Sequence, residues 1–307
     1  MLRYSLGELI TRVRNEFALS ESVAINDFIK DKINEALLWI VRQNNGRYNW
    51  LLKEASLDTA EYTEANFEFT KGSRTATLLS GTVTPRAIII YGSNHYLVTA
   101  VDGTTVTLGS QFLDDTVIDT EYTADVATMY FQLPENFIAL ETSHQVSDLS
   151  GCVLTGYDNQ RFQFMRRRVQ ATAVMDRIYT ILPDPIEEES GTQWLAIWPP
   201  YDSVDTVHYS YYAMPEALSS IADECPLPLM DRTALLYATL WFVAVSKGFD
   251  RSVIYRDIAL NDVAKLRQAA EQDDTVQFED AGSLTLDLSG TRDTDISRDT
   301  DYTPSIV

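Results

Sequence analysis

The strongest local pattern in the chain lies at residues 96–108, whose sequence is YLVTAVDGTTVTL. Apolar and polar residues alternate on both sides of the pair Asp102-Gly103. Alternation with a period of two places successive side chains on opposite faces of a strand, and Asp-Gly favours the tight turn of a hairpin. The segment therefore predicts a β-hairpin and a β region in the middle of the chain.

Further β-branched and aromatic segments surround this hairpin and are separated by glycine and proline. We expect strands at 67–69, 75–83, 88–91, 127–132, 162–165, 177–182, 194–198 and 204–212. Pro183, Pro185 and the pair Pro199-Pro200 stop two of these strands, because proline cannot donate a hydrogen bond to the ladder. The pattern predicts an inserted β-rich domain at residues 61–224.

Helical patterns precede the β region. Ser5 and Glu8 have the spacing of a capping box, so a helix is expected at about residues 6–17. A second helix is expected at 22–44, where apolar residues recur with a period of 3.6. Gly46 suits the left-handed end of that helix. The N-terminal part of a helical domain is thus expected at residues 1–60.

Two more helices are expected after the β region, at about 231–247 and 252–272. The first is capped by Asp231 and ended by Gly248, and the face of the second carries Ile254, Ile258, Val263 and Leu266. Residues 225–272 then form the C-terminal part of the helical domain. The expected fold class is α+β: a four-helix unit, formed from the N- and C-terminal helical pairs, with a long inserted β-rich domain and an extended C-terminal tail.

The tail, residues 273–307, is polar and acidic. Leu284, Leu286 and Leu288 alternate with polar residues, so residues 283–288 could add as an edge strand to another sheet. Asp293 and Arg298 lie further along. A solvated terminus is the simpler alternative. Because the tail has too little apolar surface to order alone, we expect it to dock on a neighbouring subunit or partner.

The chain of 307 residues has a formal net charge of −21. Proteins that grip nucleic-acid phosphates do so with Lys and Arg, which release counterions. This composition argues against a surface that binds DNA tightly. It is compatible with a surface past which DNA slides, or with partners that carry basic patches.

Cofactor and targeting signals are few. Cys152 and Cys225 are too few for a disulfide framework and are wrongly spaced for a zinc site, so synthesis in a reducing cytoplasm is expected. No stretch approaches the ~20 apolar residues of a membrane span, so we expect no membrane partner. Metal-binding spacings and phosphate-binding glycine loops are missing from the sequence, and we expect no cofactor and no metal.

Catalytic residues cannot be assembled convincingly from this sequence. The histidines are His95, His144 and His208, and no Gly-x-Ser-x-Gly elbow or reactive-cysteine motif accompanies them. Acidic pairs such as Asp114-Asp115 are numerous, and nothing selects one pair as the carboxylates of a glycosidase. We therefore expect that the protein is not an enzyme.

One basic cluster stands in the acidic body, at Arg166, Arg167 and Arg168. Three interpretations stay open. The cluster is the end of a strand balanced by nearby acids, a contact in which guanidinium groups pair with carboxylates of another copy or a partner, or a contact with a nucleic-acid backbone. We treat these arginines as candidate interface residues.

Tryptophans supply a second candidate. Trp50 follows the Asn45-Gly46 turn and is the best candidate for an exposed anchor at a protein interface. The remaining tryptophans lie mostly in segments with apolar patterns and are expected in the core; they are Trp39, Trp194, Trp198 and Trp241.

Several short motifs follow one another along the chain in a particular order. They are the Trp-containing turn after the N-terminal helices, Gly72 to Leu78, Tyr96 to Leu108, Leu133-Pro134-Glu135-Asn136-Phe137, Trp198-Pro199-Pro200 and Pro226-Leu227-Pro228. In this order they resemble the head-to-tail adaptor proteins of short-tailed bacteriophages, also called head-completion or tail-tubular A-type proteins. The resemblance extends to about Gln272, and the tail does not take part in it.

The resemblance implies a structural virion protein of the neck or tail. In that family a ring of subunits, usually dodecameric, sits under the portal and extends the DNA channel. For this chain it implies a homo-oligomer that binds a portal protein and a distal tail or nozzle protein, while DNA passes through without specific binding. We expect the helical unit and tail to contact the portal side and neighbouring subunits, and the β region to face the distal tail.

Other functions fit parts of the pattern. One is a tail-associated enzyme that degrades carbohydrate or peptidoglycan on a β scaffold. Another is a different virion component, such as a tail nozzle or a decoration protein, or a non-viral binding module. The order helix–β–helix favours the adaptor, because a nozzle is expected to be larger and mostly β.

Overall fold

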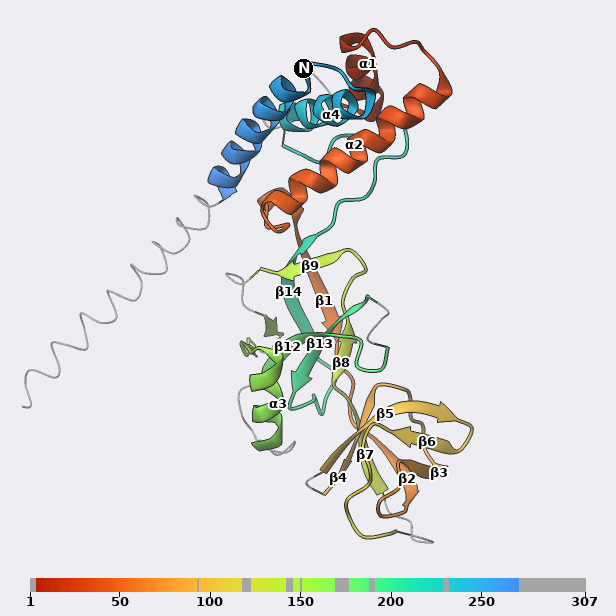
Figure 1. Cartoon of the computed structure of the whole chain (residues 1–307). Helices are drawn as coiled ribbons and strands as arrows, with labels where there is room; N and C mark the ends of the chain where they lie inside the picture. Colours follow the sequence, from red (N-terminus) through yellow and green to blue (C-terminus); the bar gives the residue numbers. More distant parts are fainter. Residues whose placement is uncertain are drawn as a thin grey trace, which may run out of the picture. The chain divides into compact units, whose positions relative to one another are not determined.

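The computed structural model describes residues 4–92, 94–117, 123–141, 146–149, 151–168, 177–187, 191–228 and 232–270. The chain divides into two compact units. The first contains Met1–Leu52 and Met214–Val307, and the second contains Lys53–Ala213. Helices predominate in the first, which we call the helical unit, and strands predominate in the second, which we call the β unit (Figure 1).

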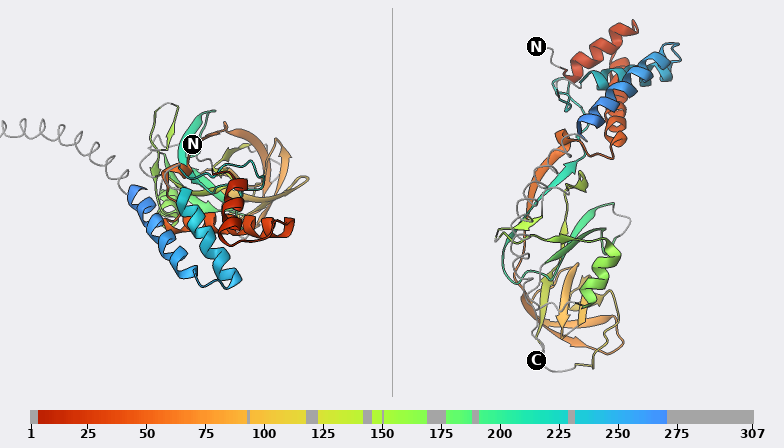
Figure 2. Two further views of the ribbon diagram at one scale, coloured as in Figure 1. Left: turned by 90° about the horizontal axis from the view of Figure 1, so that it is seen from above. Right: turned by 90° about the vertical axis from the view of Figure 1, so that its left-hand side faces the viewer.

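The helical unit is built around α4. Its described elements are α1 (Leu6–Glu16), α2 (Val23–Gln43), the 3-10 helix η1 (Asn49–Leu51), α4 (Arg232–Lys247) and a last helix at residues 252–270. Helix α4 packs against α1 and α2, and Figure 2 shows the last helix lying along α4. Because α4 is apolar on most of its circumference, it is the natural central helix.

Local capping sets the helix ends as expected. The Ser5 side chain accepts a hydrogen bond from the backbone N–H of Glu8 at 3.3 Å, and the Glu8 carboxylate accepts one from the N–H of Ser5 at 3.4 Å. The predicted capping box is therefore confirmed. Gly46 and Gly248 follow α2 and α4 with φ of 76° and 71°, a left-handed conformation that glycine adopts without strain.

An irregular segment, residues 214–228, holds the first two helices in place. The N–H of Leu6 donates to the carbonyl of Asp223 at 2.8 Å. The Asn34 amide on α2 donates to the carbonyl of Leu218 at 3.0 Å and accepts from the N–H of the same residue at 2.8 Å. These contacts fix the surfaces that α1 and α2 present.

Six strands of the β unit close into a barrel. In spatial order they are β2 (Thr63–Phe69), β3 (Thr75–Ser80), β6 (Thr105–Leu108), β5 (Asn94–Asp102), β4 (Ala87–Tyr91) and β7 (Thr123–Thr128). Buried side chains such as Phe67, Phe69 and Tyr96 fill the interior, so the barrel is a packed core and not a pore. The predicted hairpin is confirmed as β5 and β6.

Two four-stranded sheets form the rest of the described β unit. One contains β1 (Leu52–Asp58), β14 (Thr206–Ala213), β10 (Ser147–Asp148) and β9 (Phe137–Leu140). The other contains β11 (Thr155–Gly156), β12 (Ile178–Pro183), β13 (Gln193–Trp198) and β8 (Tyr130–Gln132). Their facing side chains share one core, with Leu195 and Ile197 of β13 packed in the same cluster as Val207 of β14.

Strand β13 is buried on both faces. Leu195 and Ile197 enter the core between the sheets, whereas Ala196 and Trp198 enter a second cluster with Ile88 of the barrel strand β4. This burial explains the continuous apolar run of β13, which is typical of a strand covered on both sides. The second cluster fixes the barrel against the sheets.

A buried ion pair reinforces that junction. Arg86, which precedes β4, donates to both carboxylate oxygens of Asp184 at 3.0 and 2.5 Å, and its guanidinium lies 4.9 Å from the Trp194 ring. Asp184 is 3% exposed and also accepts from the N–H groups of Ile186 and Glu187. Arg86 holds a φ of 73°, a strained value for a side chain other than glycine.

The expected fold class is wrong. The described residues form five α-helices, one of which lies inside the β unit, and one 3-10 helix, and the β content is a closed barrel plus two further sheets. A four-helix unit with one inserted β-rich domain does not describe this arrangement. Barrel closure depends on the pairing of β2 with β7, whose residues are about sixty apart in sequence, and no local pattern reports such a pairing.

The strand expected at 162–165 is also wrong, because these residues belong to α3 (Asn159–Arg168). Phe162 and Phe164 suggested alternation, but Phe162 is buried and Phe164 is 52% exposed. The Asp158 carboxylate accepts from the N–H of Arg161 at 2.9 Å. This contact caps the N-terminus of α3. Sequence reasoning did not use Asp158 as a capping signal and expected a strand.

The buried stripe of the last helix is shifted from its expected position. Ile254 is 58% exposed and Ile258 is only partly buried. The residues that face the core are Tyr255, Ala259, Val263 and Leu266. The observed residues are spaced by four, four and three, which fits the helical period as well as the expected set does. The sequence alone therefore does not distinguish the two sets, and packing against α4 buries the observed one.

Candidate interaction surfaces

An aromatic ridge lies where α2 and α4 pack together. Its members, which we call the ridge, are Phe28, Trp39, Trp241, Phe242 and Val245. The Trp39 ring is 5.4 Å from Trp241 and 6.1 Å from Phe242, with nearly perpendicular planes in both cases. The aromatic members are partly exposed and Val245 is 58% exposed. Aromatic side chains that are held by neighbours and still reach the surface are typical anchors of protein interfaces.

Charged groups border the ridge. The Lys247 ammonium lies 4.7 Å from the Phe28 ring centre, an attractive contact with the negative face of the ring. Lys32 and Glu35 on α2 form an ion pair at 2.6 Å. Charged groups therefore lie at one end of the ridge, at Lys247, and also on α2 between Phe28 and Trp39, where Lys32 and Glu35 occupy the intervening turns.

A groove opens between α1, α4 and the last helix. It has a volume of about 560 Å³ and is lined by Arg12, Asn15, Glu16, Leu236, Tyr237, Leu240, Tyr255 and Ile258. The lining from α4 and the last helix is mostly apolar, whereas α1 contributes polar and charged groups. The shape and lining suit an apolar side chain from another protein, with polar contacts at one edge.

The polar edge of the groove is fixed by Glu16. The Tyr255 hydroxyl donates to the Glu16 carboxylate at 2.6 Å, and the Arg251 guanidinium lies 3.7 Å from it. Burial raises the pKa of the Tyr255 phenol, and the hydrogen bond to Glu16 raises it further. Arg12 donates to the Tyr4 hydroxyl at 3.1 Å and lies over the Tyr4 ring. These contacts hold the polar side chains at the edge of the groove in fixed positions before any partner binds.

Sequence reasoning missed both surfaces. It assigned Trp39 and Trp241 to the core, whereas the structure leaves them partly exposed. The adjacent pair Trp241-Phe242 gives no signal of exposure, because other neighbours on α4, such as Val243 and Ala244, are both fully buried. The groove has no local signal either, because it depends on the spacing of three helices.

Trp50, the predicted anchor, lies in η1 and is partly buried. Its ring stacks on Tyr48 at 5.7 Å. The indole N–H is buried and has no hydrogen-bond partner within the described ranges. Its exposure is in the same intermediate range as that of the ridge aromatics.

Arg166, the first arginine of the predicted cluster, lies on α3, 5.5 Å from the centre of the Trp198 ring. His95 of β5 packs edge-on against the same ring at 4.6 Å. Burial and, as the smaller effect, the positive charge of Arg166 together lower the pKa of His95 to about 4. Arg166 is thus brought together with His95, a histidine considered in the search for catalysis, in a setting that keeps the imidazole neutral.

The other predicted interface residues cannot be placed. The side chains of Arg167 and Arg168 lie outside the described residues, although their backbone continues α3. Leu284, Leu286, Leu288, Asp293 and Arg298 also lie outside them. The structure therefore joins none of these side chains to the ridge or to the groove.

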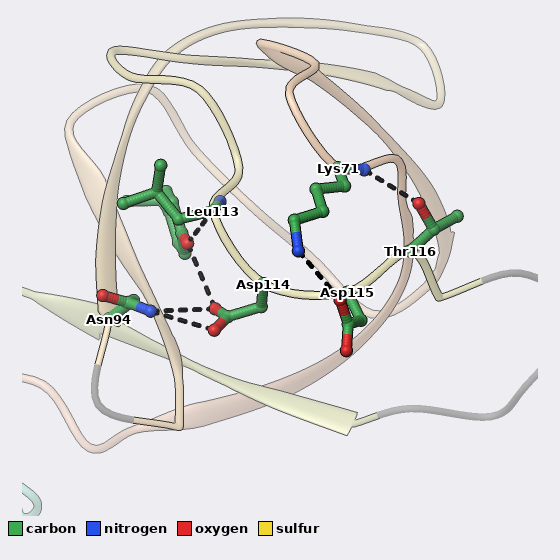
Figure 3. Close-up of polar contacts among 7 residues, drawn as sticks. Lys71, Asn94, Leu113, Asp114, Asp115 and Thr116 are labelled. Atoms are coloured by element: carbon green, nitrogen blue, oxygen red, sulfur yellow. Dashed lines mark hydrogen bonds and ion pairs between the residues drawn. The ribbon is translucent and has the colours of Figure 1, made fainter.

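A network of polar contacts holds the loop at residues 109–117 against one end of the barrel (Figure 3). Asp114 accepts from the Asn94 amide at 2.9 Å and from the Tyr96 hydroxyl at 3.2 Å. Lys71 pairs with Asp115 at 2.9 Å. Asp114-Asp115 is one of the acidic pairs among which sequence reasoning could not choose, and both of its carboxylates take part in this network.

Other chemical sites are not evident in the part of the chain that the structure describes. No group of three or more His, Cys, Asp or Glu residues there could hold a metal ion. His208 is exposed on β14, and His144 lies outside the description. None of the described helices is both long enough and apolar enough to span a membrane.

No protein-family model matches the chain, and no curated protein matches it significantly.

Proposed function

We propose that this chain is a structural protein of a short-tailed bacteriophage virion. In this role it is a head-to-tail adaptor whose copies form a ring, join the portal to the tail and continue the DNA channel. The observation that carries the proposal is the pair of apolar surfaces, the ridge and the groove, on one helical unit. Preorganised apolar surfaces with polar borders are a means of binding proteins.

The charge of the chain supports the same role. A net charge of −21 repels the DNA phosphates, so a duplex near this protein is not retained by ion pairing. The order of motifs described above supports the adaptor over other virion components. The helical unit and the C-terminal tail would contact the portal side and neighbouring copies, and the β unit would face the distal tail.

Deletion of the gene from the phage that encodes it tests the proposal. The expected product is DNA-filled heads without tails, and addition of the purified protein should restore infectivity. The particles are counted by electron microscopy and titred on the host. Infectious, tailed particles from the deletion strain would refute the adaptor role.

DNA binding gives a second measurement. Fluorescence anisotropy of a labelled duplex should show no binding at low salt, where electrostatic attraction is strongest. Tight, salt-sensitive binding would contradict a channel component past which DNA slides.

A further inference from the structure

We infer that the groove between α1, α4 and the last helix is the docking site of the chain's own C-terminal tail, which inserts Leu284, Leu286 and Leu288 into it while the protein is free. A partner that binds the groove must then displace the tail first. Such docking goes beyond the proposed function and does not depend on it. Three observations support it: the lining of the groove, the place where the last helix ends, and the charges of groove and tail.

The lining of the groove includes partly exposed apolar side chains from two helices. They are Leu236 and Tyr237 of α4 and Ile258 of the last helix. The three leucines of the tail alternate with Thr285 and Asp287, so in an extended segment all three point to one side. Such a segment can bury its leucines in the groove and leave its polar side chains in water.

The tail begins close enough to the groove for this segment to reach it. The last helix ends at residue 270, and its residues Tyr255 and Ile258 line the groove. At about 1.5 Å per residue, these two positions lie roughly 18–22 Å back along the helix from its end. Fourteen residues lead from 271 to Leu284, and a stretch of that length without regular structure spans about 19–22 Å on average.

This match of lengths selects the chain's own tail over a segment of another molecule. The effective concentration of a tethered segment is highest when the average length of its linker equals the distance to be spanned, and for short linkers it lies in the millimolar range. A free partner at micromolar concentration competes poorly with such a segment unless its own affinity is much higher.

The charges of the groove edge and of the tail have opposite signs. Residues 271–288 contain six Asp and Glu residues and no Lys or Arg. The edge carries the guanidinium groups of Arg12 and Arg251 and the carboxylate of Glu16, which is already paired with Arg251. Arg12 is hydrogen-bonded to the neutral Tyr4 hydroxyl, and within the described ranges no carboxylate forms an ion pair with it. An acidic segment therefore meets a positive charge that has no acidic partner among the described residues.

Disulfide formation between introduced cysteines tests the inference in the full-length protein. Leu286→Cys is combined with Ile258→Cys, which places a thiol in the groove. The matched control combines Leu286→Cys with Leu260→Cys. Leu260 lies on the same helix at nearly the same distance from the tail, but it is 45% exposed and points about 200° away from Ile258. Cys152→Ser removes the partly exposed native thiol from both proteins, and Cys225 is buried.

Oxidised glutathione is the oxidant, so each disulfide forms from two protein thiols and releases two molecules of reduced glutathione. The rate of intrachain disulfide formation is followed on non-reducing gels and by mass spectrometry. It should be at least about tenfold higher for the groove pair than for the control pair. Reaction with a small thiol reagent corrects for the accessibility of the two helix positions.

Blocking the groove gives a second measurement. Asn15→Trp fills the groove from an exposed position on α1 and should reduce the rate of the groove pair to that of the control pair. Circular dichroism confirms that each variant is folded. If Ile258→Cys disturbs folding, Leu236→Cys replaces it, because Leu236 also lines the groove and is partly exposed.

Three results would overturn the inference. Equal corrected rates for the two pairs would show that the tail does not lie in the groove. A disulfide of the groove pair that joins two chains would show that the occupant comes from a second copy. An unchanged rate in Asn15→Trp would place the contact outside the groove. The virion deletion experiment is independent of all three results, so failure of tail docking and failure of the adaptor role are distinguishable.

Discussion

Loss of the Asp184 carboxylate should destabilise the β unit strongly. Asp184 is 3% exposed and accepts both hydrogen bonds of the Arg86 guanidinium, in addition to two backbone N–H groups. In Asp184→Ala all four donors lose their acceptor. The guanidinium is left as an unpaired charge where the barrel meets the sheet of β12 and β13.

The magnitude follows from the burial of the two partners. Removing one partner of a buried ion pair costs about 3–5 kcal/mol, mostly because the other charge is left unpaired. The Arg86 side chain is 26% exposed, so water reaches part of it and the cost lies at the lower end. We expect about 3 kcal/mol for Asp184→Ala and about 2 kcal/mol for Asp184→Asn, which keeps the shape and one acceptor.

Lowering the pH should reduce the difference in the free energy of unfolding between the wild type and Asp184→Ala. Burial acts to raise the pKa of Asp184, but the hydrogen bond from Arg86 and the N–H groups of Ile186 and Glu187 outweigh it, and the pKa is lower than the ordinary 3.8. A carboxyl whose pKa is depressed by folding contributes its full stability above the unfolded pKa. That contribution is lost as the pH falls through the folded pKa.

Hydrogen exchange in β4 and β12 measures this effect within the β unit itself, and urea unfolding gives the total change. Asp115→Ala is the control, because Asp115 forms an exposed ion pair and should leave stability unchanged within error. Double substitution with Arg86→Ala should be less than additive. A loss below about 1 kcal/mol for Asp184→Ala, or a loss independent of pH, would refute the reasoning.

Three further predictions concern local features. Ser5→Ala removes the cap of α1 and should cost about 1 kcal/mol, seen as faster hydrogen exchange in the first turn of α1; unchanged exchange would contradict the role of the cap. Burial and then Arg166 lower the pKa of His95 to about 4, so its contribution to stability is complete above the ordinary 6.5 and is lost as the pH falls toward 4. An NMR titration of the imidazole with a midpoint near 6.5 would disprove this. Leu266→Ala should cost about 2–4 kcal/mol in thermal unfolding, whereas Ile254→Ala should stay within about 0.5 kcal/mol; a similar cost for the two substitutions would support the expected stripe, to which both residues belong.

The features that sequence reasoning predicted well depend on neighbours in the chain. The start of α1 follows from Ser5 and Glu8, and the hairpin of β5 and β6 follows from alternation around Asp102-Gly103. These signals extend over three to thirteen residues, a distance that local hydrogen bonds span. The strand expected at 162–165 was wrong because these residues lie in α3, where Phe162 and Phe164 point about 200° apart, so that Phe162 is buried as α3 packs against β12 and Phe164 is exposed.

Sequence reasoning predicted the helices of the helical unit better than it predicted the two surfaces that these helices form. Trp39 and Trp241 have the composition of core residues, and only the position of α2 beside α4 leaves both at the surface. The groove combines residues from α1, α4 and the last helix, and α1 is separated from the other two by more than two hundred positions in the chain. Its existence depends on how far apart three helices lie.

The amino-acid sequence by itself determined where α1 begins, where the hairpin of β5 and β6 turns, which residues are apolar, and that the protein is strongly acidic. Capping, turn preference and charge are properties of short segments, and they act before distant residues meet. Tertiary structure alone decided that β2 pairs with β7 to close a barrel, that β13 is covered on both faces, and that the helical unit has a ridge and a groove. Such features arise from contacts between distant segments, whose energies compete with the entropy of loop closure and leave no periodic mark in the sequence.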